Sequence, residues 1–264
     1  MRRAVPWFFV VLSSVAPSLA QGPNAQGRTA SRAPSRPPYS TYVHSWHTPA
    51  PDRTASVDEH GRPKLVLMVL NTQERVELRA LDARGGFESV DLDRASHALR
   101  EPSSGNEHPI DPRVLDAVYR IQVHFGAQEI RVVSGYRTPR TIAGRNGSNH
   151  GRGRAIDLVV PGTSDQDVAK FAREMGFMGV GIYPTSGFVH VDVRDRSYFW
   201  VDNSGPGRRN RERGVLADVA ARADREAAAR GEHGLPPLAI ASDVDGLLGG
   251  HAVAAEPVPE EDDD

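Results

Sequence analysis

Two short segments place histidine and aspartate side chains where they could bind a metal ion. The first, SNHGRGRAIDL, holds His150 seven positions before Asp157, and the second, GFVHVDV, holds His190 and Asp192. Two imidazoles and one carboxylate are a ligand set of catalytic zinc sites, in which water takes the fourth position. Because zinc lowers the pKa of that water to about 7 and polarises carbonyl groups, these residue types indicate hydrolytic chemistry.

Both segments contain a predicted β-strand, in which side chains alternate between two faces. In RAIDLVV this alternation places Asp157 on one face of the strand and Ile156 and Leu158 on the other face. In GFVHVDV it places His190 and Asp192 on the same face. Burying a carboxylate without a partner is costly, so a cation near Asp157 is expected.

Each residue also has a purely structural interpretation. His150 could be an ordinary loop residue, Asp157 could cap a turn, and His190 could be a core histidine with its hydrogen bonds satisfied. Spacing alone does not show that the three side chains converge.

Periodicity, capping residues and turn residues predict the elements that position these strands. PKLVLMVLNTQERVELRAL predicts a hairpin with strands over 64–70 and 75–80. IDPRVLDAVYRIQVHFG predicts a helix capped by Asp111, with Pro112 at its first position, and SDQDVAKFAREMG predicts a second helix capped by Ser164. EIRVVSG and GVGIYP predict two more strands. The expected fold class is α+β, with a small antiparallel sheet flanked by helices.

The ends of the chain differ in composition from its middle. Residues 1–20 combine two arginines, an apolar stretch and small residues, which predicts a secretory signal peptide cleaved after Ala20. Residues 21–60 are rich in Pro, Ser and Thr and predict a disordered linker. Residues 203–264 predict a low-complexity, largely disordered tail, in which an alanine-rich stretch could form a helix with a thin apolar face. One domain, 61–202, is therefore expected to carry the function in the periplasm or cell envelope.

Charge and cysteine content narrow the class of protein. The chain has 32 basic and 34 acidic residues and a formal net charge of −2, which gives no indication of nucleic-acid binding. It has no cysteine, so disulfides and lipid attachment through cysteine are excluded. A monomer without stable membrane insertion after signal cleavage is expected.

The motifs VVSGYRTPRT, SNHGRGRAIDL and GFVHVDV, followed by YFW, occur in this order. Together they resemble the superfamily of zinc D-Ala-D-Ala metallopeptidases, lysostaphin-type enzymes and hedgehog, and most closely its YcbK-like murein endopeptidase branch. The resemblance covers about residues 64–202. It implies a zinc site on the sheet, with His150, Asp157 and His190 as the ligands.

The resemblance also implies roles around that site. Arg137 would hold a substrate carbonyl or carboxylate, with Tyr136 beside it in the wall of the site. Carboxypeptidase members carry an acidic general base three residues before the last histidine, a position that is Gly187 here. Asp192 is a candidate base because strand alternation aims it to the same side as His190. Orientation of a zinc-bound histidine is an equal alternative for Asp192.

The expected function is a zinc-dependent peptidase that hydrolyses peptide cross-links of peptidoglycan, with stem peptides as its partners. Two alternatives stay open: a non-catalytic zinc-containing module that binds the cell wall, and a D,D-carboxypeptidase acting on stem peptides. His108 and Asp111, in EHPID, are further candidates for the base, although Asp111 also suits a helix cap.

Overall fold

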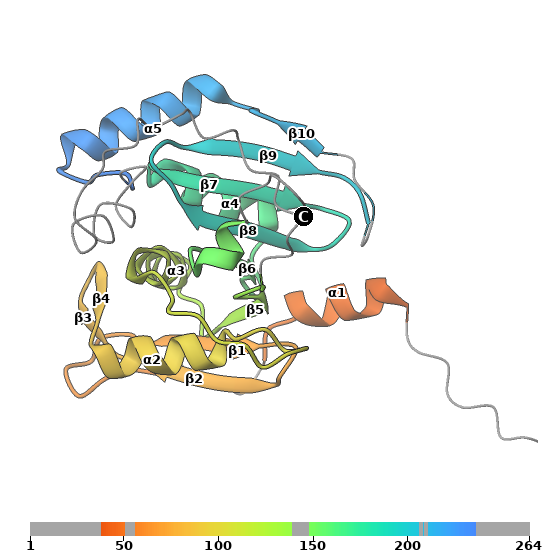
Figure 1. Cartoon of the computed structure of the whole chain (residues 1–264), viewed down its shortest axis with the longest axis vertical. Helices are drawn as coiled ribbons and strands as arrows, with labels where there is room; N and C mark the ends of the chain where they lie inside the picture. The colour runs from red at the N-terminus through yellow and green to blue at the C-terminus, as the bar shows by residue number, and fades with distance from the viewer. Residues whose placement is uncertain (1–37, 51–55, 139–147, 206–207, 209–210, 236–264) are drawn as a thin grey trace, which may run out of the picture. The chain divides into compact units, whose positions relative to one another are not determined.

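The structure is a computed structural model, shown in Figure 1. It describes residues 38–50, 56–138, 148–205, 208 and 211–235. The predicted signal peptide and the end of the predicted tail lie outside the described residues. Within the described part of the chain, no helix is both long and apolar enough to cross a membrane.

An eight-stranded mixed sheet forms the centre of the fold, in the order β10-β9-β7-β8-β6-β5-β1-β2. Its strands are β1 (Leu65–Val69), β2 (Glu74–Leu78), β5 (Ile130–Ser134), β6 (Ala155–Val159), β7 (Met178–Tyr183), β8 (Phe188–Val193), β9 (Tyr198–Asp202) and β10 (Arg211–Arg213). The α+β class is confirmed, but the prediction of a small antiparallel sheet was wrong. The β1–β5 and β7–β9 pairs are parallel, because the chain crosses over between them instead of turning back in a hairpin.

Helices flank this sheet (Figure 1). The helices are α1 (Tyr39–His47), α2 (Ser89–Ala98), α3 (Pro112–His124), α4 (Asp165–Glu174) and α5 (Ala217–Ala229), and a small hairpin is formed by β3 (Ala80–Asp82) and β4 (Gly85–Phe87). Helices α3, α4 and α5 pack against the sheet, and α2 packs beside β2. The buried core lies under these helices and includes Leu158, Val180 and Val191. Asp157 and His190 lie on the opposite face, which we call the cluster face.

The local predictions between residues 61 and 202 are confirmed where they rested on capping and turn residues. Strands β1 and β2 form the expected antiparallel hairpin. Asp111 caps α3 by accepting a hydrogen bond from the Arg113 amide, and Ser164 caps α4 by accepting one from the Asp167 amide. Each cap satisfies an amide at the exposed start of its helix.

The flanking segments contain more structure than their composition predicts. Helix α1 lies within the predicted linker, and β10 and α5 lie within the predicted tail. Helix α5 has the thin apolar face expected from its alanines, but Asp224 fixes it to the domain. The Asp224 carboxylate accepts hydrogen bonds from the amides of Phe177 and Ser197, at 2.6 and 2.9 Å. Partly buried polar contacts of this kind have no periodic sequence signature.

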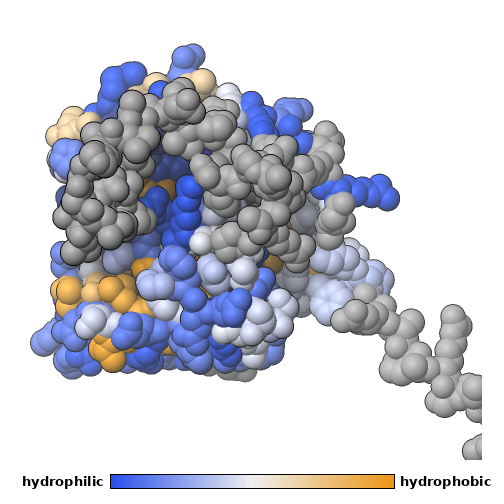
Figure 2. Space-filling view, in the orientation of Figure 1, coloured by the Kyte–Doolittle hydropathy of each residue, from blue (hydrophilic) through white to orange (hydrophobic). Residues whose placement is uncertain are grey.

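Most of the described surface in the view of Figure 2 is hydrophilic. Apolar atoms gather over the region of β3, β4 and α2, where Leu81 and Val90 are more than half exposed. This area lies on elements other than those that carry the histidines and aspartates of the sequence motifs.

Candidate metal centre

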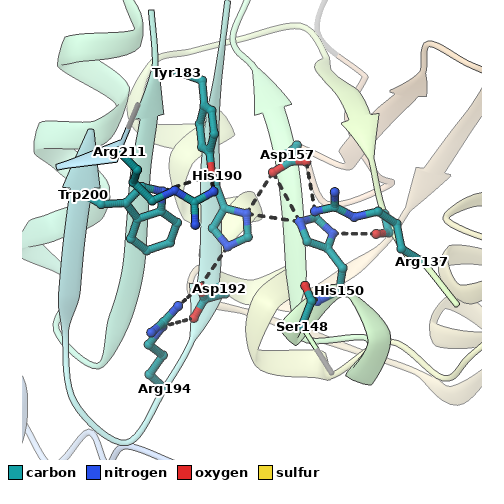
Figure 3. A network of polar contacts seen from close by, with 11 residues as sticks. Arg137, Ser148, His150, Asp157, Tyr183, His190, Asp192, Arg194, Trp200 and Arg211 are labelled. Atoms are coloured by element: carbon teal, nitrogen blue, oxygen red, sulfur yellow. Dashed lines mark hydrogen bonds and ion pairs between the residues drawn. The ribbon is translucent and has the colours of Figure 1, made fainter. Parts of the chain in front are cut away.

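Three side chains converge on the cluster face (Figure 3). Asp157 and His190 are register partners on the neighbouring strands β6 and β8. His150 comes from the short 3₁₀-helix η1 (Asn149–Arg152), whose first turn is capped by the Ser148 hydroxyl. His150 Nε2 lies 3.1 Å from His190 Nδ1 and 3.3 Å from Asp157 Oδ1, and His190 Nδ1 lies 2.9 Å from the same oxygen. All three side chains are buried.

The hydrogen bonds at the far sides of the two imidazoles indicate which nitrogens carry protons. His150 Nδ1 lies 2.7 Å from the carbonyl oxygen of Gly135, so it donates its hydrogen there. His190 Nε2 lies 2.8 Å from Asp192 Oδ2 and donates to that carboxylate. In neutral imidazoles these assignments leave lone pairs on His150 Nε2 and His190 Nδ1. Two nitrogen lone pairs and a carboxylate oxygen therefore face one another, and this set of donor atoms fits a zinc ion.

The charge of Asp157 is maintained despite its burial. Burial raises the pKa of the Asp157 carboxyl, but His150, His190 and Arg137 outweigh that effect and hold the pKa well below its ordinary value. The Arg137 guanidinium reaches Asp157 Oδ2 with Nη2 at 3.6 Å. An ionised carboxylate beside two imidazole lone pairs is the protonation state that a metal cation requires of its ligands.

Asp192 contacts the histidine on the side away from the three converging atoms. It is fully buried and accepts hydrogen bonds from Arg194, with Nε on Oδ1 at 2.6 Å and Nη2 on Oδ2 at 2.9 Å. Burial raises the pKa of Asp192, but Arg194 and His190 together hold it below its ordinary value. The geometry thus favours orientation of His190, the second of the two roles that the sequence left open for Asp192.

A tryptophan completes the surroundings of His190. The Trp200 ring lies 5.1 Å from the His190 ring, and its Nε1 donates to the Tyr183 hydroxyl at 3.0 Å. The indole crosses β7 at Gly181, where an added Cβ would overlap Trp200 Cε2 and Nε1. Gly181, the second glycine in GVGIYP, is therefore required for Trp200 to lie beside His190.

Helix α1 occupies the space beside Gly187, the position that holds an acidic base in the carboxypeptidase members. Gly187 has a φ of +73°, and an added Cβ there would overlap Val43 of α1. The Tyr39 hydroxyl donates to the Ser186 carbonyl at 2.9 Å, and His47 Nε2 lies 3.2 Å from the Gly187 carbonyl. A side chain at position 187 would therefore be strained in its backbone and would displace α1.

The remaining sequence candidates lie apart from the three converging atoms. The Tyr136 ring stacks on His108 at 5.2 Å, and its amide donates to the Leu99 carbonyl. Asp111 caps α3 and pairs with Arg113 and Arg154. Arg194 was not predicted from the sequence, although it lies two residues past Asp192 and so on the same face of the chain.

Residues 58–198 match the family described as peptidoglycan L,D-endopeptidase MepK. The chain belongs to this family. The peptidoglycan L,D-endopeptidase MepK of Escherichia coli K12 is 32% identical over 142 residues, which cover 50% of this chain and 78% of the relative. The probable peptidoglycan L,D-endopeptidase MepK of Haemophilus influenzae is 34% identical over 134 residues, 47% of this chain and 72% of the relative. No solved structure matches the chain.

The matched range contains His150, Asp157 and His190 but not every element around them. Helix α1 precedes the range, and Trp200, β10 and α5 follow it. These flanking elements lie outside the matched range.

Proposed function

We propose that this protein is a zinc-dependent peptidoglycan peptidase that cleaves peptide cross-links as an L,D-endopeptidase. The observation that carries the proposal is the convergence of His150 Nε2, His190 Nδ1 and Asp157 Oδ1 within 3.3 Å of one another. Membership of the MepK family supplies the reaction class and the substrate.

In this proposal His150, Asp157 and His190 hold the zinc. When bound, zinc supplies a water of lowered pKa and polarises the scissile carbonyl. The chain prepares the site by fixing both imidazole tautomers, through the Gly135 carbonyl and the Asp192 carboxylate. Such partners orient a ligand and raise its basicity.

Arg137 is proposed to bind the substrate. Its side chain is 37% exposed and lies beside Asp157. A guanidinium at this position can donate to a carbonyl oxygen and stabilise negative charge that develops on it. Tyr136, which precedes it, supports this loop through its stacking on His108.

Asp192 is proposed as a residue that orients His190, because it contacts Nε2 and its lowered pKa makes it a weak base. Gly187 cannot supply the acidic base of the carboxypeptidases, and membership of the MepK family favours an endopeptidase over a D,D-carboxypeptidase. We further propose that residues 1–20 direct export to the periplasm or cell envelope and that residues 61–202 carry the activity.

The ligand assignment is tested with the variant His150→Ala. The matched control is His60→Ala, because His60 is exposed. Zinc content is measured by mass spectrometry after dialysis, and peptide release is measured on isolated sacculi. The proposal predicts that His150→Ala loses both zinc and peptide release, while His60→Ala keeps both. Full activity of His150→Ala would contradict the ligand assignment. Retained zinc in the wild type without any peptide release would instead favour a wall-binding module.

A further inference from the structure

A group of cationic and aromatic side chains adjoins the three ligands on the side of His190 opposite Asp157 (Figure 3). The Arg211 guanidinium lies 5.8 Å from the ring centres of both Trp200 and Tyr183. Its Nη2 donates to the Tyr183 hydroxyl at 2.9 Å.

The register of the sheet explains this placement. Gly181 pairs with His190 on one side and with Trp200 on the other, so the indole and the imidazole lie in one row across three strands. Strand β10 then pairs with β9, with Arg211 opposite Asp202. The last strand of the sheet thus carries the Arg211 guanidinium to 5.8 Å from the Trp200 ring, which itself lies 5.1 Å from the His190 ring.

The charges on the cluster face balance before any metal is added. Three ion pairs lie there: Asp157–Arg137 at 3.6 Å, Asp192–Arg194 at 2.6 Å and Asp202–Arg211 at 3.4 Å. With two neutral imidazoles these three pairs sum to zero, so a bound zinc ion would give this group of residues a charge of +2. A cleft of positive charge attracts anionic ligands.

We propose that Arg211 binds a free carboxylate of the peptidoglycan stem peptide and thereby sets the specificity of the enzyme. The inference rests on the proposed function. Arg211 is suited to this role because a guanidinium that stacks on aromatic rings holds its N–H fork in a fixed plane, and that fork matches a carboxylate. Its side chain is 17% exposed, so a ligand can reach it. Arg194 is the less suitable group, because it holds the buried Asp192 carboxylate at 2.6 and 2.9 Å, whereas Arg211 Nε lies 3.4 Å from the Asp202 carboxylate.

Arg211 lies beyond residue 198, where the match to the MepK family ends. The recognition therefore depends on a residue outside the matched range. It predicts a preference for carboxylate-bearing stem peptides that depends on a residue of the C-terminal segment.

The experiment compares two substrates and three variants. The substrates are a cross-linked muropeptide dimer and the same dimer with its free carboxylates amidated. The variants are Arg211→Gln, Arg211→Lys and the control Arg222→Gln, which removes an exposed arginine from α5 on the opposite face of the sheet. All are tested as zinc-loaded full chains, and their thermal unfolding is compared first.

Loss of a hydrogen bond to a charged group corresponds to about a ten- to hundredfold change in affinity. We expect Arg211→Gln to raise KM for the carboxylate dimer by that factor with little change in kcat, and to leave KM for the amidated dimer unchanged. Arg211→Lys should recover part of the loss, and Arg222→Gln should behave as wild type. An equal effect of Arg211→Gln on both dimers, or a loss confined to kcat, would overturn the inference.

A failure of the proposed function would have a different signature. If wild type cleaves neither dimer, calorimetric binding of the same two dimers to wild type and Arg211→Gln still decides the role of Arg211. Tighter binding of the carboxylate dimer to wild type alone would support it, and equal binding to both proteins would refute it.

Discussion

Replacing Asp192 by asparagine separates the two roles that a carboxylate beside His190 could have. The substitution keeps the size of the side chain but removes its charge. In the wild type this carboxylate accepts from His190 Nε2 at 2.8 Å and from two nitrogens of Arg194 at 2.6 and 2.9 Å. An asparagine cannot accept at both positions, because its amide nitrogen would face a donor.

The expected magnitudes follow from this geometry. Removing one partner of a buried ion pair costs about 3–5 kcal/mol of unfolding free energy, and the low end applies because the Arg194 side chain is 16% exposed. The variant should therefore remain folded. Loss of an orienting partner typically weakens metal binding about 10- to 100-fold, which is about 1.4–2.7 kcal/mol.

The assay measures zinc affinity by competition with a chelator and kcat at saturating zinc. If Asp192 orients His190, Asp192→Asn lowers zinc affinity by the stated factor, and saturating zinc restores most of the activity. Asp195→Asn, the same change at an exposed neighbour, should alter neither quantity. Unchanged zinc affinity with a fall in kcat of about 10²–10⁴ would refute this reasoning and identify Asp192 as the base.

Three further predictions concern packing and pH. Gly181→Ala should lower the unfolding free energy by about 1–3 kcal/mol, because the new methyl group overlaps the β9 indole, and urea unfolding measures the loss. Gly187→Glu should destabilise the protein without raising carboxypeptidase activity, since its φ of +73° alone costs about 1–2 kcal/mol. Adding Val43→Gly should recover only the steric part of that loss, and full recovery would contradict the backbone contribution. Hydrogen bonds, led by that from Ser56, lower the pKa of Glu77 from 4.5 to about 2. The ionised Glu77 therefore contributes fully to the unfolding free energy above pH 4.5, and this contribution is lost as the pH falls toward 2. Glu77→Gln should therefore flatten the dependence of unfolding free energy on pH across that window.

The local elements of the central domain could be predicted because their signals are local. A proline after Asp111 and a serine before α4 mark helix starts, and alternation in RAIDLVV and GFVHVDV separates the core face from the cluster face. Pairing across the sheet was not predictable in this way. The parallel β1–β5 and β7–β9 pairs depend on contacts between segments far apart in sequence.

The same limit applies to the candidate metal centre. The family motifs identified His150, Asp157 and His190, but the partners that fix their protons include a main-chain carbonyl, that of Gly135, which no side-chain pattern reveals. The docking of α1 could not be predicted either, because its polar contacts involve backbone groups: carbonyls of the β7–β8 turn, and its own last carbonyls, which accept from Arg131. Arg211 was missed because its role depends on the strand neighbours of Trp200 and not on its own sequence context.

The most direct test of the account is mass spectrometry of purified cross-linked muropeptide dimers after incubation with the protein. Three samples are compared: the zinc-loaded protein, the protein treated with a chelator, and the chelated protein with zinc restored. The account predicts conversion of dimers to monomers in the first and third samples only, with fragment masses that assign the cleaved bond to the L,D cross-link. Equal conversion in the chelated sample would contradict the zinc-dependent mechanism, and loss of a terminal alanine alone would contradict the endopeptidase assignment.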